Sequence, residues 1–128
     1  MTDPAYVLIA VLAILQTKHF VCDYLLQTPY QLLNKGIYLH PGGLLHAGLH
    51  VLFTMAAFLV APPALALGIA IVVGEFLVHY HIDWVKEQLI RRKGWDATQR
   101  NFWWAIGFDQ LLHHLTYIVI AGLLAAVF

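Results

Sequence analysis

Four long apolar segments constrain what this chain can fold into more than any other feature of its sequence. They cover about residues 4–28, 44–60, 64–90 and 102–127. A helix needs roughly 17 to 25 mostly apolar residues to cross the hydrocarbon core of a bilayer. Inside a bilayer only helices and closed barrels satisfy all of their backbone hydrogen bonds. The segments therefore predict an all-α, polytopic integral membrane protein built as a four-helix transmembrane bundle.

The composition agrees with this class and excludes several functions. Hydrophobic residues make up 61% of the chain and charged residues 11%, against about 25% charged residues in a typical soluble domain. A length of 128 residues favours a single domain over residues 1–128. The net charge of zero gives no basic surface for a nucleic acid, so we expect no such partner. Cys22 is the only cysteine and serine is absent, which excludes an internal disulfide and a serine nucleophile.

Basic residues between the segments predict the orientation in the membrane. Lys35 lies in the first connection, and the third contains Arg91, Arg92, Lys93 and Arg100. The N-terminus, the second connection and the C-terminus contain no lysine or arginine. Because basic loops stay on the cytoplasmic side, we expect the first and third connections in the cytoplasm and both termini outside it.

Each apolar segment also contains ionisable residues spaced four apart. The segment 64–90 contains Glu75, His79 and Asp83, at positions i, i+4 and i+8. The other segments contain the pairs His19/Asp23, His46/His50 and Asp109/His113. Residues four apart lie on the same side of a helix, and ionisable groups inside a membrane are costly unless they are paired. With about 1.5 Å of rise per residue, all nine groups fall in the cytoplasmic half of the bilayer.

A divalent metal would neutralise such a layer, because it binds neutral imidazole nitrogens and carboxylate oxygens. Nine donors exceed the four of one tetrahedral site, so we expect two metals about 3.5–4 Å apart. Zinc is preferred, and iron or manganese fit the same donor set. Glu75 or Asp83 is the predicted general base. The predicted metal ligands are His19, Asp23, His46, His50, Glu75, His79, Asp83, Asp109 and His113.

Other polar residues receive supporting roles. Lys18 and Lys86 are expected to extend their ammonium groups to the membrane interface. Tyr117 continues the stripe of Asp109 and His113 by one turn, where it can hydrogen-bond a substrate or simply pack. Three glutamines are candidate hydrogen-bond partners of the ligands: Gln16, Gln27 and Gln110. Five glycines are expected to let helices approach closely: Gly43, Gly48, Gly68, Gly74 and Gly107.

These motifs resemble a known protein family over nearly the whole chain. The segments that carry the resemblance are 18–28 (KHFVCDYLLQT), the His46/His50 pair, 75–83 with Lys86, and 109–113 (DQLLH). The family consists of small bacterial inner-membrane proteins and is catalogued only as a domain of unknown function. The chain is also distantly similar to families described as membrane-bound metal-dependent hydrolases. The resemblance implies a bacterial inner membrane and metal-dependent chemistry.

Several functions agree with these patterns. We expect a metal-dependent hydrolase of a membrane lipid or another membrane substrate, in which two metals activate water. The alternatives are a transporter of divalent metal or one coupled to protons, and a di-iron oxidoreductase of lipids. If no metal binds, the histidines and carboxylates form a hydrogen-bond network that holds the bundle together. A homodimer is compatible with each of these functions.

Overall fold

The structure, a computed structural model, describes residues 3–127, and every regular element in that range is a helix. Four helices, counted with their irregular ends, are long and apolar enough to cross a membrane. This result confirms the all-α fold class. The helices are α1 (Pro4–Phe20) with a π-helical turn (Val21–Leu25), the short α2 (Pro29–Asn34), α3 (Pro41–Thr54) with a 3-10 segment (Met55–Leu59), α4 (Leu65–Lys93) and α5 (Arg100–Ala125).

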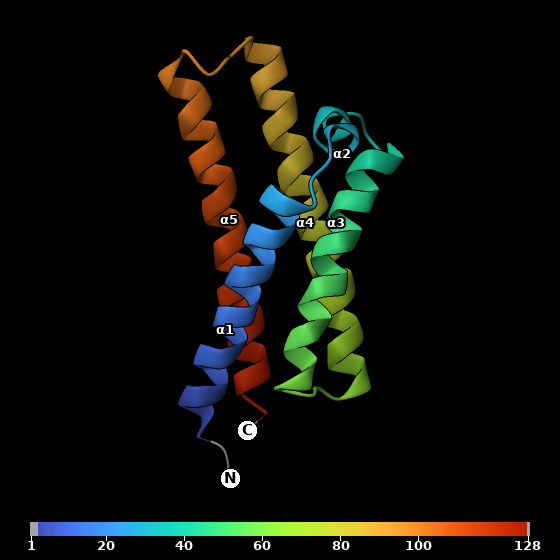
Figure 1. Ribbon diagram of the computed structural model, residues 1–128, viewed down its shortest axis with the longest axis vertical. Coiled ribbons are helices and arrows are strands. Elements are labelled where there is room, and N and C mark those ends of the chain that lie inside the picture. The colour runs from blue at the N-terminus through green and yellow to red at the C-terminus, as the bar shows by residue number, and fades with distance from the viewer. Residues whose placement is uncertain (1–2, 128) are drawn as a thin grey trace.

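The long helices run along one another, and the ends of the chain lie together. In Figure 1 both termini are at the lower end of the bundle, whereas α2 and the connection between α4 and α5 are at the upper end. In any up-and-down bundle with an even number of helices, the two ends of the chain lie at the same end of the bundle. The two connections with basic residues therefore lie at the same end of the molecule.

Prolines begin three of the helices, and each has a capping side chain before it. Asp3 Oδ1 accepts a hydrogen bond from the Ala5 amide at 2.8 Å, and Pro4 begins α1. His40 Nδ1 accepts from the Gly42 amide at 3.0 Å, and Pro41 begins α3. Proline suits the first position of a helix because its missing N–H would have no partner there. The predicted start near residue 44 is wrong by one turn for this reason.

The first segment, predicted as one helix over residues 4–28, is divided. Regular α-helix ends at Phe20, and the π-helical turn follows, closed by a hydrogen bond of 2.9 Å from the Leu26 amide to the Val21 carbonyl. Pro29 then begins α2 and so does not merely end a helix. Single π-helical turns often occur at functional sites, and this one contains Asp23.

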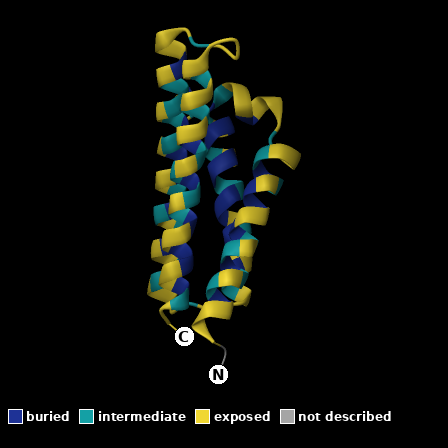
Figure 2. Ribbon diagram, turned by 90° about the vertical axis from the view of Figure 1, so that its left-hand side faces the viewer, coloured by how far each residue is buried: buried dark blue, intermediate teal, exposed yellow. Residues whose placement is uncertain are grey.

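The buried residues divide the bundle into an apolar half and a polar half. The apolar half lies toward the termini, and its core includes Val7, Val11 and Leu15 of α1 together with Leu124 of α5. The buried histidines and carboxylates lie further along the helices, toward α2. Figure 2 shows the buried residues facing the inside of the bundle. The polar site is therefore closed off at one end by packed apolar side chains.

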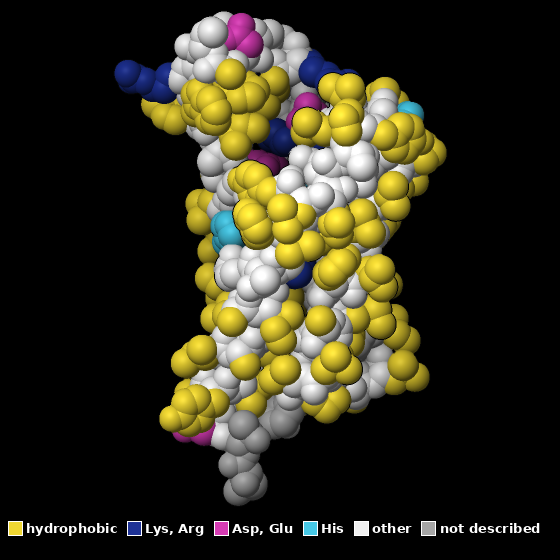
Figure 3. Space-filling view, viewed as in Figure 1, with side chains coloured by type: hydrophobic (Ala, Val, Ile, Leu, Met, Phe, Trp, Pro, Cys, Tyr) yellow, Lys and Arg dark blue, Asp and Glu magenta, His cyan; other side chains and the backbone are white. Residues whose placement is uncertain are grey.

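The outer surface is apolar along most of its length. Hydrophobic side chains cover much of the face in Figure 3, and charged side chains there are few. Leu59, Leu65 and Ile118 are 87%, 80% and 55% exposed. Exposed apolar surface of this extent is typical of a protein that contacts membrane or other proteins.

Most of the glycines predicted to let helices approach closely do not lie at close helix contacts. A Cβ atom would have no described neighbour within 4 Å at three of the predicted positions: Gly48, Gly74 and Gly107. The prediction of close helix approach is wrong there. The tightest contact with backbone is at Gly42, where a Cβ would lie 2.6 Å from the Tyr30 carbonyl oxygen. Gly42 therefore lets α2 pack against the first turn of α3.

Candidate metal centre

Seven of the nine predicted ligands come together, and they come from all four long helices. They form three groups of three residues, and in each group one donor atom per residue lies within 4.8 Å of the others. The groups are His19/Asp23/His50, His46/His50/His79 and His79/Asp83/His113. The i, i+4 spacing explains this convergence, because it aims two side chains of each helix at the same region of the bundle.

Two of these groups share no residue and have the same composition of two histidines and one aspartate. We call His19, Asp23 and His50 the first triad, and His79, Asp83 and His113 the second triad. The catalytic zinc sites of several enzymes use two histidines and one carboxylate and keep a fourth position open. Non-haem iron oxygenases use the same donor set. The composition of both triads therefore agrees with metal binding.

In the second triad each histidine lies close to one oxygen of Asp83, and the two histidines approach different oxygens. His79 Nε2 lies 3.5 Å from Asp83 Oδ2, and His113 Nε2 lies 3.4 Å from Asp83 Oδ1. Zinc–nitrogen and zinc–oxygen bonds of about 2.0–2.1 Å in tetrahedral geometry place two donor atoms about 3.3 Å apart. The second triad has nearly this separation.

His79 gives independent support for a metal at the second triad. Its side chain is 2% exposed, and neither Nδ1 nor Nε2 has a hydrogen-bond partner among the described residues. A buried polar group without a partner costs about 1–3 kcal/mol. A metal ion bound at Nε2 would satisfy one of the two nitrogens and offset that cost.

The first triad is hydrogen-bonded in a way that competes with a metal. His50 Nε2 lies 2.8 Å from Asp23 Oδ1, and His19 Nε2 lies 2.7 Å from Gln110 Oε1 and 3.2 Å from Asp23 Oδ2. Oxygens of carboxylates and amides accept, so both Nε2 atoms donate protons in this arrangement. A metal at the first triad must displace these two protons. In the second triad one nitrogen, His113 Nε2, is hydrogen-bonded, at 3.4 Å from Asp83 Oδ1, and Lys35 Nζ lies 3.2 Å from Asp83 Oδ2. Because both histidines of the first triad donate through shorter hydrogen bonds, we regard it as the weaker of the two candidate sites.

The outer nitrogens of the same two rings support this assignment. Tyr117 Oη lies 2.8 Å from His19 Nδ1, and Lys18 Nζ lies 3.2 Å from His50 Nδ1. An ammonium group can only donate, so His50 Nδ1 accepts and its proton is on Nε2. Gln110, predicted as a hydrogen-bond partner of the ligands, does contact His19. Tyr117, expected to bond a substrate or to pack, bonds the His19 ring instead.

His46 lies between the two triads and is 1% exposed. Its Nε2 atom is 3.2 Å from Asp23 Oδ1 and 3.5 Å from Asp83 Oδ2, and it makes no hydrogen bond among the described residues. Its Nδ1 atom lies 3.2 Å from Gln31 Oε1, which accepts a proton from the ring. When the neutral ring has its proton on Nδ1, the lone pair of Nε2 points at the carboxylates of Asp23 and Asp83. A metal or a second ring proton would remove that repulsion.

Glu75, a predicted ligand, belongs to none of the three groups. Its Oε1 atom lies 2.5 Å from Lys18 Nζ, and the two side chains are 0% and 3% exposed. Lys18 Nζ also donates to the His50 carbonyl at 3.2 Å. The prediction that Lys18 extends to the interface is wrong, because the buried carboxylate of Glu75, on α4, holds its ammonium group in the core.

Asp109, the other predicted ligand outside the groups, lies at the edge of the second triad. Its Oδ1 atom is 3.5 Å from His113 Nε2 and has no hydrogen-bond partner among the described residues. Its Oδ2 atom accepts a hydrogen bond from Gln110 Nε2 at 3.1 Å. The hydrogen bond from Gln110 therefore positions the Asp109 carboxylate, and its Oδ1 atom remains without a partner beside the second triad.

Two residues of this site were not found by sequence reasoning. Lys35 is 5% exposed, and its Nζ lies 3.2 Å from Asp83 Oδ2, whereas the sequence indicated only a basic loop residue. Gln31, 2% exposed, contacts His46 from the short helix α2. One indication in the sequence that Gln31 is buried at the site was its position as a polar residue between the apolar residues 29–30 and 32–33.

The formal charge of the site is negative when the histidines are neutral. Two ammonium groups, on Lys18 and Lys35, lie against four carboxylates. The carboxylates belong to Asp23, Glu75, Asp83 and Asp109. The difference is a charge of −2, which one divalent cation would neutralise. Charge balance and the free nitrogens of His79 therefore indicate the same ligand.

Comparisons with known proteins give a family but no activity. A family model with the description "Protein of unknown function (DUF3307)" matches residues 11–127. No curated protein and no solved structure matches the chain. The matched range includes both triads and His46. Support for a function therefore comes from the site itself.

Proposed function

The chain belongs to the DUF3307 family of unknown function, and we propose that it is a membrane metalloenzyme that hydrolyses a phosphoester of a membrane lipid. The observation that carries this proposal is the pair of separate triads, each with two histidines and one aspartate, in which every residue except the partly exposed Asp23 is buried. Two metals held side by side can activate water and bind both the attacking and the leaving oxygen of a phosphoester.

The residues around the triads have distinct roles in this proposal. The second triad (His79, Asp83 and His113) binds one metal. The first triad binds the other metal after the protons on its two Nε2 atoms have been displaced. Asp83, predicted as general base, is then occupied as a ligand, and Glu75 is engaged by Lys18. Asp109 has a free oxygen beside the second triad, so we assign to it the role of proton acceptor.

Charge balance favours a phosphoester over a neutral ester. One divalent metal neutralises the formal charge of −2 at the site, and a second one leaves a charge of +2. A hydroxide ion and an anionic phosphate group would offset that excess. Burial makes such compensation necessary, because an unpaired charge is costly in a region of low dielectric constant.

The apolar half of the bundle favours an enzyme over a transporter. Ion pathways through membranes are marked by polar groups or water-filled cavities. Below this site the side chains of Val7, Val11, Leu15 and Leu124 pack together, with exposures of 2% or less. A di-iron oxidoreductase is the second candidate, because its iron would use the same donor set as the triads.

Metal analysis together with a hydrolysis assay tests the proposal. We expect purified protein to contain about two zinc ions per chain and to release phosphate-containing products from phospholipid in detergent micelles. Asp109→Asn should keep the metal and lose hydrolysis by roughly 100-fold or more, the range typical of a general base. Absence of metal after purification with added zinc would exclude both enzyme proposals. Bound iron with a visible absorption band would favour oxidation.

The site is proposed to open toward the cytoplasm. The basic connections lie at the end of the bundle opposite the termini (Figure 1), which agrees with basic loops on the cytoplasmic side. In the bacterial inner membrane, alkaline phosphatase fused to the C-terminus should be active, because that enzyme matures only outside the cytoplasm. A fluorescent cytoplasmic reporter at the same end should be dark. The opposite pair of results would reverse the orientation.

A further inference from the structure

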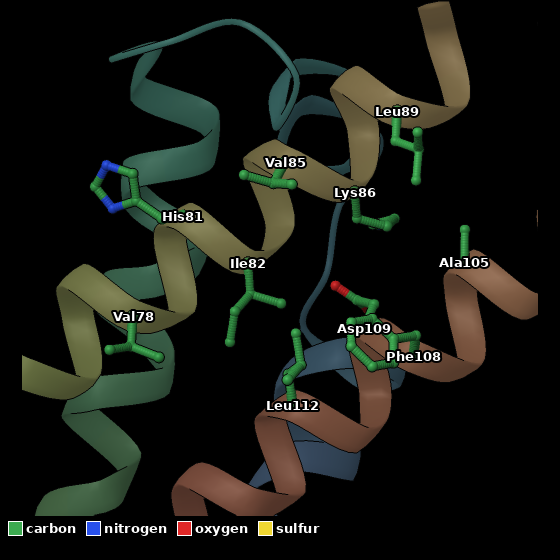
Figure 4. A pocket seen from close by; sticks show the side chains of 10 residues that line it. All are labelled: Val78, His81, Ile82, Val85, Lys86, Leu89, Ala105, Phe108, Asp109 and Leu112. Carbon is green, nitrogen blue, oxygen red and sulfur yellow. The ribbon is translucent and has the colours of Figure 1, made fainter. Parts of the chain in front are cut away.

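A groove between α4 and α5 lies beside the second triad. Its volume is about 470 Å³, within the range of small-molecule sites. Seven of its ten lining residues are apolar, among them Val85 and Leu89 of α4 and Phe108 and Leu112 of α5 (Figure 4). Exposed apolar side chains surround it, so in a bilayer its mouth faces the acyl chains of lipids.

Two charged residues give the groove a polar end. Lys86 extends from α4 and Asp109 from α5, and Figure 4 shows both among the apolar side chains. Lys86 Nζ bonds Glu87 Oε1 at 2.8 Å, which uses one of its three protons and leaves two for a ligand. Asp109 connects the groove to the metal centre, because its Oδ1 lies 3.5 Å from His113 Nε2.

We propose that this groove binds an anionic phospholipid, with one acyl chain against the apolar wall and the phosphate at Lys86. This inference rests on the proposed function and deepens it by naming the substrate class and its route of entry from the membrane. Because Lys86 is paired with Glu87 and Asp109 is a carboxylate, the attraction for an anionic phosphate comes mainly from the formal charge of +2 that two bound metals would leave beside Asp109. The two remaining protons of Lys86 would donate hydrogen bonds to that phosphate. The headgroup thus arrives next to the metal ligands.

Native mass spectrometry of the full chain in detergent tests the proposal with two probes, dioleoyl phosphatidylglycerol and dioleoyl phosphatidylcholine. We expect the wild-type protein to retain the anionic lipid preferentially. Lys86→Gln should lower this preference about fivefold, since one basic group near a membrane surface contributes about 1 kcal/mol. Lys86→Arg should keep it. Ala105→Phe, which fills the groove, should reduce retention of both lipids.

Matched controls separate the groove from general effects. Lys93→Gln removes the same charge from an exposed position of α4, and Ala66→Phe adds the same bulk to an exposed position near its start. Both variants should retain lipid as the wild-type protein does. Thermal unfolding in detergent identifies any variant that does not fold. If Ala105→Phe fails to fold, the comparison of lipid preference between Lys86→Arg and Lys86→Gln still tests the proposal.

Two results would overturn the inference. Equal retention by wild type, Lys86→Gln and Ala105→Phe would place the lipid elsewhere. A dimer that Ala105→Phe dissociates, without any groove-dependent lipid, would make the groove an interface between copies of this chain. Failure of the proposed function is distinguishable: lipid retained in the groove without hydrolysis in the zinc-loaded protein contradicts the activity alone.

Discussion

Replacing His79 with alanine is expected to remove metal from the second triad and to lower the affinity for zinc by more than about 100-fold. Loss of an outer hydrogen-bond partner alone costs about 10- to 100-fold in metal affinity, and a lost ligand costs more. Equilibrium dialysis against buffered zinc, followed by elemental analysis, measures this change. His81→Ala is the matched control, because His81 is exposed and bonds the Leu77 carbonyl and Tyr38.

The two triads should differ in the same experiment. His19→Ala should lower only the weaker zinc equivalent, because the first triad must lose two donated protons before it binds metal. Zinc binding by His79→Ala with unchanged affinity and stoichiometry would show that the second triad is not a metal site. His79 would then be a buried histidine that has no hydrogen-bond partner among the described residues.

Replacing Lys18 with methionine is expected to destabilise the protein by about 3–5 kcal/mol. This is the usual effect of removing one partner of a buried ion pair, because the other charge is left uncompensated. Here the carboxylate of Glu75 would remain, with its side chain 0% exposed. Unfolding by sodium dodecyl sulfate in mixed micelles, followed by circular dichroism, measures the free energy of unfolding.

A double variant isolates the pair from the packing around it. Lys18→Met with Glu75→Leu replaces both charges by apolar side chains and should recover most of the lost stability, since such replacements are often neutral or stabilising. Lys93→Met, at an exposed position, should change stability by no more than about 0.5 kcal/mol. A Lys18→Met protein as stable as the wild type, with no effect of the second substitution, would contradict a structural role for the pair.

The membrane-length helices and much of the candidate site could be predicted from sequence. A repeat of four residues places His46 and His50 on one side of a helix whatever the rest of the chain does, and the same is true of His79 and Asp83. Seven of the nine predicted ligands meet in the structure for this reason. Their role as metal ligands stays a prediction, as does the catalytic role of Glu75 and Asp83.

Local patterns could not predict which polar groups pair across helices. Lys18 and Glu75 are 57 positions apart in the chain and 2.5 Å apart at their charged atoms. Whether a lysine reaches the interface or turns inward depends on the rotation of both helices. The π-helical turn that contains Asp23 is a similar case, because its sequence is as apolar as that of an ordinary helical turn.

Four membrane-length helices and a polar stripe on each could therefore be predicted without the structure. Both follow from apolar length and a period of 3.6 residues, which are local properties of the chain. The packed structure places Asp83 between His79 and His113, whereas Glu75, two turns away on the same helix, pairs with Lys18. The partner of a buried charge depends on how the helices pack, and no local pattern of residues contains that information.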